Sequence, residues 1–224
     1  MVKLFFLCRR RPDLTHDRYV ERLLGGHVPL ALRHHPTLRR YVVNIVEGTR
    51  GPARPLDSIG ELCFDSLADY RERLYDSPEG ARIIAEDVAG FLGGADAYVV
   101  AEHVQRTPAE PPTTGVRMPG DKLFACLVRR PDLARDDFVA HWLGRHAPLA
   151  LRHHDTTRYV IDVVEERLGQ GPAYDGFAEL SFPPGELGRH LYLSPEGQAE
   201  VEADIPRFIG MVDAYLVSEY VQRW

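Results

Sequence analysis

The sequence HVPLALRHH at His27–His35 returns, with one change, as HAPLALRHH at His146–His154. Working outward from this pair, residues 3–106 realign on residues 122–223. Each copy is too long to be a solenoid unit, so the chain is expected to form two complete folding units. Shorter matches support the alignment: RRPDL at Arg10–Leu14 and Arg129–Leu133, and SPEG at Ser77–Gly80 and Ser194–Gly197.

Apolar and β-branched runs predict four strands in each copy. In the first copy these are residues 3–8, 41–47, 59–64 and 97–104. One helix is expected after the first strand, capped by Thr15, and another at SPEG, where serine is the N-cap and proline is at N1. Pro29 and Pro148 should kink the first helix or begin a new one.

The order β-α-β-β-α-β is that of ferredoxin-like folds, with two helices on one face of a four-stranded antiparallel sheet. The predicted class is α+β: two ferredoxin-like repeats packed sheet to sheet as an intramolecular α+β barrel. The domains would be residues 1–106 and 121–224. The Pro-rich, unrepeated segment 107–120 would link them.

Composition excludes several classes of protein. The 224 residues are 44% hydrophobic and 27% charged, with a net charge of −6, so no nucleic-acid footprint is indicated. No run approaches the roughly 20 apolar residues of a membrane span. The N-terminus does not resemble a signal peptide, and the three cysteines suggest free thiols in a reducing cytoplasm.

The first helix carries a histidine on its apolar stripe. With helical spacing the stripe is Tyr19, Leu23, His27, Leu30 and His34, and its second copy is Phe138, Trp142, His146, Leu149 and His153. Imidazole titrates near neutrality and can move a proton between carbon and oxygen atoms. Catalysis by His27 and His146 and a buried structural role are therefore both open.

The second helix carries an aspartate at the edge of its apolar face, Asp87 in one copy and Asp204 in the other. Such a carboxylate can orient a histidine, although it can also simply reach water.

Further candidates would bind the substrate. Tyr19, Leu23, Phe138 and Trp142 would form an apolar wall, while Tyr41 and Tyr159 could steady an enolate oxygen. His34 and His153 would line the same pocket if the prolines break the helix, with His35 and His154 on another face. Asn44 and Asp162 interrupt apolar strands and would meet solvent or the substrate cleft. Glu61 and Glu179 lie mid-strand beside leucine and are candidates for the cleft or the barrel rim.

No metal site is predicted, because His27 and His34 lie about 10 Å apart on a straight helix and no third ligand has suitable spacing. There is also no G-x-S-x-G, dinucleotide fingerprint or P-loop. No cofactor is therefore expected from the sequence.

Together, the basic P-x-L segment, H-x-P-L-A, a strand opening with R-Y, E-L-x-F and the acidic residue before phenylalanine resemble the EthD family of dimeric α+β barrels, in tandem. The resemblance covers both repeats. It implies a cofactor-free enzyme of aromatic polyketide metabolism, with His27 and His146 at the family's histidine position and Asp87 and Asp204 at its acidic position. The double histidines are a departure from the family pattern.

Three functions follow from this reading. The first is a cyclase, dehydratase or decarboxylase that works by His-mediated proton transfer on a polyketide-type substrate. The others are an anthrone-type oxygenase without cofactor and a non-catalytic module that binds a hydrophobic metabolite. A small aromatic substrate is the expected partner, without nucleic acid or membrane. The chain would be a pseudo-dimer, and further homo-oligomers are open.

Overall fold

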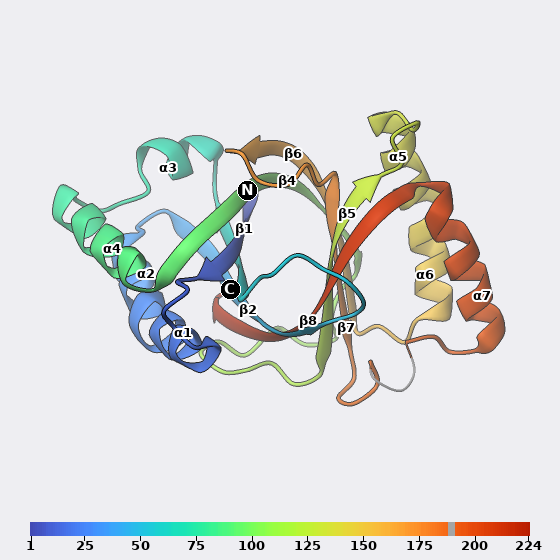
Figure 1. The fold of residues 1–224 in the computed structure, drawn as a ribbon, viewed down its shortest axis with the longest axis horizontal. Helices are drawn as coiled ribbons and strands as arrows, with labels where there is room; N and C mark the ends of the chain where they lie inside the picture. The colour runs from blue at the N-terminus through green and yellow to red at the C-terminus, as the bar shows by residue number, and fades with distance from the viewer. Residues whose placement is uncertain (188–190) are drawn as a thin grey trace.

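Eight antiparallel strands close into one barrel in a computed structural model that describes residues 1–187 and 191–224 (Figure 1). Around the barrel the order is β1-β3-β2-β8-β5-β7-β6-β4. The two repeats are therefore hydrogen-bonded to each other at both edges, through β2 with β8 and β4 with β6. The strands are β1 (Val2–Arg10), β2 (Leu38–Thr49), β3 (Ser58–Phe64), β4 (Leu92–Arg106), β5 (Asp121–Arg129), β6 (Arg158–Leu168), β7 (Gly176–Phe182) and β8 (Ile209–Arg223).

Alternation along each strand divides its side chains between two buried environments. In β1, Leu4 packs in the core of the first helical layer, whereas Phe5 and Leu7 belong to a separate core inside the barrel. The barrel core is rich in aromatic rings, with Phe5 in edge contact with Phe124 and Phe177. Both faces of the sheet are therefore buried.

The helices form two groups on opposite sides of the barrel (Figure 1). The first repeat contributes α1 (His16–Arg22), η1 (Leu23–His27), α2 (Val28–His34), α3 (Leu67–Glu72) and α4 (Pro78–Phe91). The second contributes α5 (Arg135–His141), η2 (Trp142–His146), α6 (Ala147–His153), α7 (Pro195–Asp204) and η3 (Ile205–Arg207). The predicted caps are present, since Thr15, Ser77 and Ser194 accept hydrogen bonds from the third residue after each.

A π turn lies where a proline was expected to interrupt the first helix. Residues Leu23–His27 (η1) make wider turns than an α-helix, and α2 then begins with Pro29 in its first turn, where a backbone N–H is not required. The π turn takes up additional chain, so it changes which later residues face the sheet. The second repeat has the same arrangement at Trp142–His146.

Part of the segment between the repeats, just before β5, forms backbone hydrogen bonds with β8. Gly115 N–H donates to the Val221 carbonyl at 2.7 Å, and Met118 N–H donates to the Glu219 carbonyl at 2.8 Å. The three cysteines are free. Among the described helices, none is both long and apolar enough to cross a membrane.

Candidate active site

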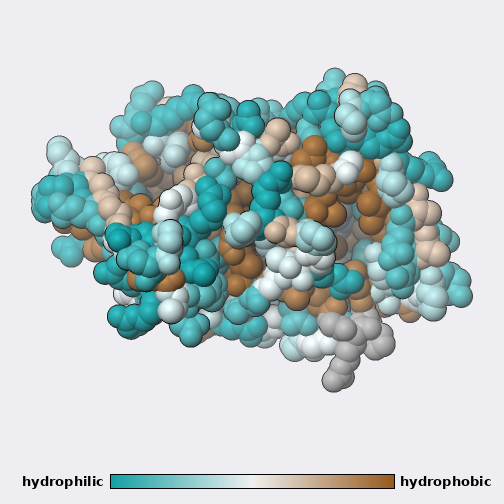
Figure 2. Space-filling model, in the orientation of Figure 1, coloured by the Kyte–Doolittle hydropathy of each residue, from teal (hydrophilic) through white to brown (hydrophobic). Residues whose placement is uncertain are grey.

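A cavity of about 280 Å³ lies between the helices and the sheet of the first repeat. Most of its wall is apolar, formed by residues such as Phe6, Leu23, Val43 and Phe91. Figure 2 shows hydrophobic side chains in the hollows between helices and strands, while the outer helix faces are hydrophilic. The polar side chains that line the cavity are Cys8, Tyr19, His27, His35, Tyr41, Ser58, Tyr70 and Tyr75.

His27 and Asp87 form a hydrogen-bonded dyad at the cavity wall. The Nδ1 atom of His27 lies 2.9 Å from Oδ2 of Asp87, so of the two alternatives for Asp87 the structure has the one in which the carboxylate contacts the histidine. Burial lowers the pKa of His27 below its usual value, and the Asp87 hydrogen bond opposes that change only in part. The ring is therefore neutral at pH 7. A carboxylate only accepts hydrogen bonds, so Nδ1 carries the proton and Nε2 keeps a free lone pair.

Two phenols also reach the cavity from opposite sides. Tyr19, on α1, shares a hydrogen bond of 2.7 Å with the Ser58 hydroxyl, whereas the Tyr41 hydroxyl has no hydrogen-bond partner among the described residues. Burial raises the pKa of both tyrosines well above its usual value, so both hydroxyls keep their protons. Tyr41 is thus available to donate a hydrogen bond to a ligand.

The structure corrects the assignment of the double histidine. His34 does not line the cavity: its Nδ1 contacts Asp76, and its ring packs against Gly80 at the start of α4. His35 lines the cavity instead. The π turn explains the difference, because pocket-facing positions then advance by four residues, from His27 through Ala31 to His35.

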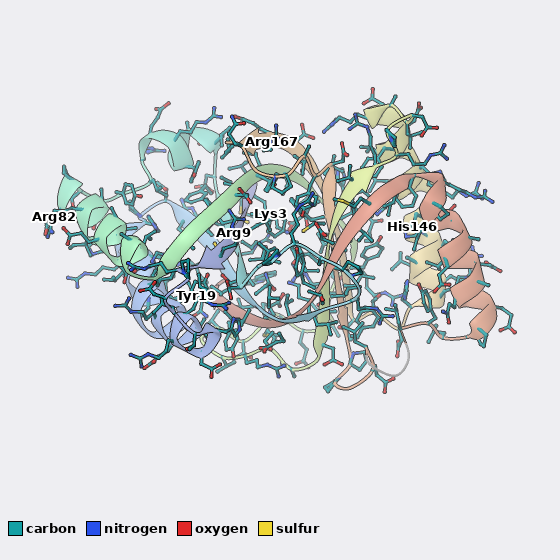
Figure 3. All side chains as sticks on the ribbon, viewed as in Figure 1. Lys3, Arg9, Tyr19, Arg82, His146 and Arg167 are labelled. Carbon is teal, nitrogen blue, oxygen red and sulfur yellow. The ribbon has the colours of Figure 1, made fainter. Side chains whose placement is uncertain are left out.

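The second repeat uses the equivalent residues differently. His146 Nδ1 lies 3.1 Å from Asp204, but His141 and Arg145 also contact that carboxylate, at 3.1 and 3.0 Å. The first-repeat residues equivalent to His141 and Arg145 are Arg22 and Gly26. Asp87 therefore lacks the two additional contacts that Asp204 makes. Figure 3 shows His146 against the helical layer opposite Tyr19. His153 contacts Glu200 and packs on Gly197, so it mirrors the structural role of His34.

Trp142 occupies much of the space that corresponds to the first cavity. It takes the place of Leu23 and packs directly on Gly176, where the first repeat has Ser58. Burial raises the pKa of the neighbouring Tyr159 phenol, and the indole of Trp142 opposes that rise in part. Phe138 and Phe208 complete an aromatic cluster around the indole. Phe138 and Trp142, which were expected to form part of a substrate wall, and Tyr159, which was expected to steady an enolate oxygen, are therefore packed core. Among the described residues, the first repeat holds the more open site.

The polar residues of the strands lie inside the barrel, which corrects their expected exposure. Asn44, Glu61, Asp162 and Glu179 are all 0% exposed, and none lines the cavity. Strand alternation turns them away from the helices, and Figure 3 places Lys3 among the strands beside them. The predictions that Asn44 and Asp162 meet solvent or the cleft, and that Glu61 and Glu179 lie at the cleft or the barrel rim, were wrong.

Lys3 is the centre of this internal charge cluster. Its ammonium lies 2.7 Å from Glu179, 2.8 Å from Glu102, 3.0 Å from Asp162 and 3.5 Å from Glu61. Three of these carboxylates, Glu61, Glu102 and Glu179, are close enough together to hold a cation. Lys3 contacts all three, Arg40 also contacts Glu61 and Glu102, and Lys122 also contacts Glu179, so cationic side chains of the protein already pair with these carboxylates.

Asp162 carries a carboxylate where the first repeat has the neutral Asn44. Burial raises the pKa of Asp162 well above its usual value, with further contributions from Glu179 and Glu61 that Lys3 opposes. Its oxygens accept no hydrogen bond among the described residues, and Lys3 meets it only as an ion pair. A negative charge at this position therefore opposes folding.

Asp162→Asn should consequently stabilise the protein at pH 8, by about 1 kcal/mol. A carboxyl whose pKa is raised on folding costs stability as pH rises above its unfolded value of about 3.9. The gain should therefore shrink on acidification and vanish below about pH 4. Urea unfolding of both proteins across this range is the measurement. A variant that is less stable at pH 8 would show that the charge is needed.

The closed barrel, with helical layers on opposite sides and an apolar cavity under one layer, places this chain in the class of α+β barrels. Solved structures agree on the fold. An anthrone oxidase-like protein superimposes with a TM-score of 0.63 at 10% identity, covering 99% of this chain and 92% of that one. A proposed monooxygenase from Lactobacillus acidophilus gives 0.55 at 10% identity, covering 99% and 96%. A chlorite dismutase variant from Candidatus Nitrospira defluvii gives 0.51 at 10% identity, covering 97% and 90%.

The family is shown by the sequence itself. The EthD domain model matches residues 11–95 and again residues 130–211, one match in each repeat. The chain belongs to the EthD family, as a tandem member. No curated protein matches it.

Proposed function

We propose that this protein is an enzyme that removes a proton from a small aromatic or polyketide-type substrate without a cofactor. The observation that carries the proposal is the Asp87–His27 dyad at the wall of an apolar cavity. The volume of this cavity, about 280 Å³, is near the lower end of the roughly 300–1,000 Å³ typical of small-molecule sites. The apolar wall suits a planar hydrophobic compound with an acidic C–H or O–H group.

In this mechanism His27 is the general base. Its Nε2 lone pair accepts the substrate proton, and Asp87 stabilises the resulting imidazolium through the Nδ1–H bond. The Tyr41 hydroxyl donates a hydrogen bond to the enolate or phenolate oxygen as negative charge develops there. The imidazolium then returns the proton to the product, so no external redox partner is required.

The anion formed in this step can have two fates. Protonation after ring closure, loss of water or loss of CO₂ gives a cyclase, dehydratase or decarboxylase of the lyase type. Reaction of the anion with O₂ gives an oxygenase, which the likeness to an anthrone oxidase-like protein keeps as the second candidate. Oxygen uptake during turnover separates the two, and we favour proton transfer because the dyad alone suffices for it.

The test is proton exchange, which needs no knowledge of the natural product. The protein is incubated in D₂O with bicyclic and tricyclic aryl ketones, including 2-tetralone and anthrone, and loss of the α-proton signal is followed by NMR. We expect exchange well above the rate in buffer for at least one compound. Binding without any exchange above background would instead support a module that only stores a hydrophobic metabolite.

We make several further proposals about the fold, location and partners of this protein. We infer that each half is a ferredoxin-like repeat, which the orders β4-β1-β3-β2 and β8-β5-β7-β6 support. We also propose that residues 1–106 and 121–224 form two domains and that the protein is cytoplasmic. We further propose that it has no nucleic-acid or membrane partner and that it can associate beyond the internal pseudo-dimer.

A further inference from the structure

His35 is the second histidine of the cavity, and the proposed reaction does not use it. It lies at the C-terminal end of α2, where a non-helical backbone conformation turns the chain away from the helix. Its side chain is 5% exposed and lines the same cavity as His27. A buried imidazole in a ligand cavity needs a partner for each ring nitrogen.

The protein supplies only one of these partners. Nδ1 of His35 lies 2.9 Å from the Leu74 carbonyl oxygen, which can only accept a hydrogen bond. Nδ1 must therefore carry the proton, and Nε2 is left as an acceptor without a partner among the described residues. Burial lowers the pKa of His35, which keeps the ring neutral and the lone pair free.

The two histidines thus present the same chemistry to the cavity. In each ring Nδ1 is held by an acceptor of the protein, an Asp87 carboxylate or a Leu74 carbonyl, and Nε2 is an unprotonated acceptor. A ligand that satisfies both must donate two hydrogen bonds. A ligand with one hydroxyl would leave the second lone pair buried and unpaired.

The two acceptors are also well separated. His27 and His35 are eight residues apart along one helix, which corresponds to about 12 Å along its axis. Each hydrogen bond to a ring nitrogen spans about 2.8 Å, and both side chains lean over the cavity. Hydroxyl groups at opposite ends of a fused two-ring skeleton are therefore better suited to this spacing than two neighbouring hydroxyls.

We propose that His35 is a specificity-determining residue and that the cavity selects aromatic compounds with two hydroxyl groups at opposite ends of the ring system, one donating to each histidine. This inference rests on the proposed function, since it names the substrate class of the same site. His35 holds the distal hydroxyl and takes no part in proton transfer. It therefore orients the substrate so that its reacting end meets His27.

The experiment compares two ligands and two protein variants in a cycle. Binding of 2,6-dihydroxynaphthalene and of 2-naphthol is measured by calorimetry at pH 8. His35→Asn retains an amide N–H near the position of Nδ1, so the bond to Leu74 can persist, but it removes the Nε2 acceptor. The matched control is His154→Asn, which alters the equivalent contact with Leu191 in the second repeat.

The wild-type protein should bind the dihydroxy compound more tightly. His35→Asn should weaken that compound about threefold to tenfold, the value of one hydrogen bond, and leave 2-naphthol unchanged. 2-Naphthol should donate to His27, whose lone pair the Asp87 carboxylate makes the stronger acceptor. The control should bind both compounds like the wild type.

Two results would overturn the inference while leaving the proposed function intact. One is an equal loss of affinity for both ligands in His35→Asn, which would mean that the residue only shapes the cavity. The other is no loss for either ligand. If the wild-type protein binds neither naphthol nor dihydroxynaphthalene, the aromatic substrate class itself is wrong, and both proposals fail together.

Discussion

His27→Asn should lower the rate of proton exchange by about 10²–10⁴-fold, the usual contribution of a general base. Asparagine can keep a hydrogen bond to Asp87 near the position of Nδ1, but it has no atom equivalent to Nε2. The fold should therefore survive while the base is lost. Exchange of the aryl-ketone α-proton, followed by NMR on the intact chain, measures the effect.

The second repeat supplies the matched control for this variant. His146→Asn changes the same dyad geometry, but Asp204 there is also held by His141 and Arg145, and Trp142 occupies the adjoining space. Its exchange rate should stay within about a factor of two of the wild type. Equal losses in both variants would show that the second repeat also contains a working site.

Asp87→Asn offers a further check on the assigned tautomer. An amide N–H can donate to Nδ1, which places the proton on Nε2 and removes the base. The rate should fall although the imidazole of His27 remains in place.

In the wild-type protein the rate of proton exchange should be lost only below pH 6.5, because burial lowers the pKa of His27 and the neutral form is the active one.

Lys3→Met should destabilise the protein by about 3–5 kcal/mol at pH 7, the largest stability change expected for a single variant. The ammonium of Lys3 is 3% exposed and contacts three buried carboxylates inside the barrel and the partly exposed Glu102. Burial alone would lower the pKa of Lys3, but Asp162, Glu179, Glu61 and Glu102 outweigh burial and raise it well above its usual value. Removing Lys3 leaves Asp162 without a cationic partner among the described residues, and leaves Glu61 and Glu102 with only Arg40 and Glu179 mainly with Lys122.

The loss of stability in Lys3→Met should become smaller as the pH is lowered. As the pH falls, carboxylates that have lost their Lys3 partner can take up protons in the variant, which removes the uncompensated charge. The difference in unfolding free energy between Lys3→Met and the wild type should therefore narrow on acidification. Arg82→Met is the control, because Arg82 pairs with Glu79 and Glu86 on the exposed face of α4 and its loss should change little. Equal destabilisation by both variants would contradict the central place assigned to Lys3.

Part of the candidate site was predictable because local patterns encode it. The helical stripe placed His27 on the sheet side, and the second helix placed Asp87 on the facing edge; the structure brings them together at 2.9 Å. His34 was chosen over His35 because a regular helical period was assumed. A π turn changes that period through its hydrogen bonds, and no residue pattern in this chain signals the change.

The strand residues were misplaced for a different reason. A period of two separates Glu61 from Leu62, but it does not say which face points to the helices. Both faces of this sheet are buried, one under helices and one inside the barrel, so a buried glutamate was not an obvious assignment. Its partner Lys3 comes from another strand, and Glu179 comes from the other repeat.

By itself, the sequence determined that the chain contains two copies of one folding unit and the order of strands and helices in each, because repeats, periodicity and caps act over short distances along the chain. It also placed a histidine and an aspartate on the apolar edges of two helices, but left open whether they meet. Only the tertiary structure decided that the two halves join edge to edge through β2 with β8 and β4 with β6, that Trp142 packs on Gly176 while the space beside Leu23 stays open, and that His35 reaches the cavity. These features arise from contacts between segments remote in sequence, where the shape of one side chain sets the room left for another.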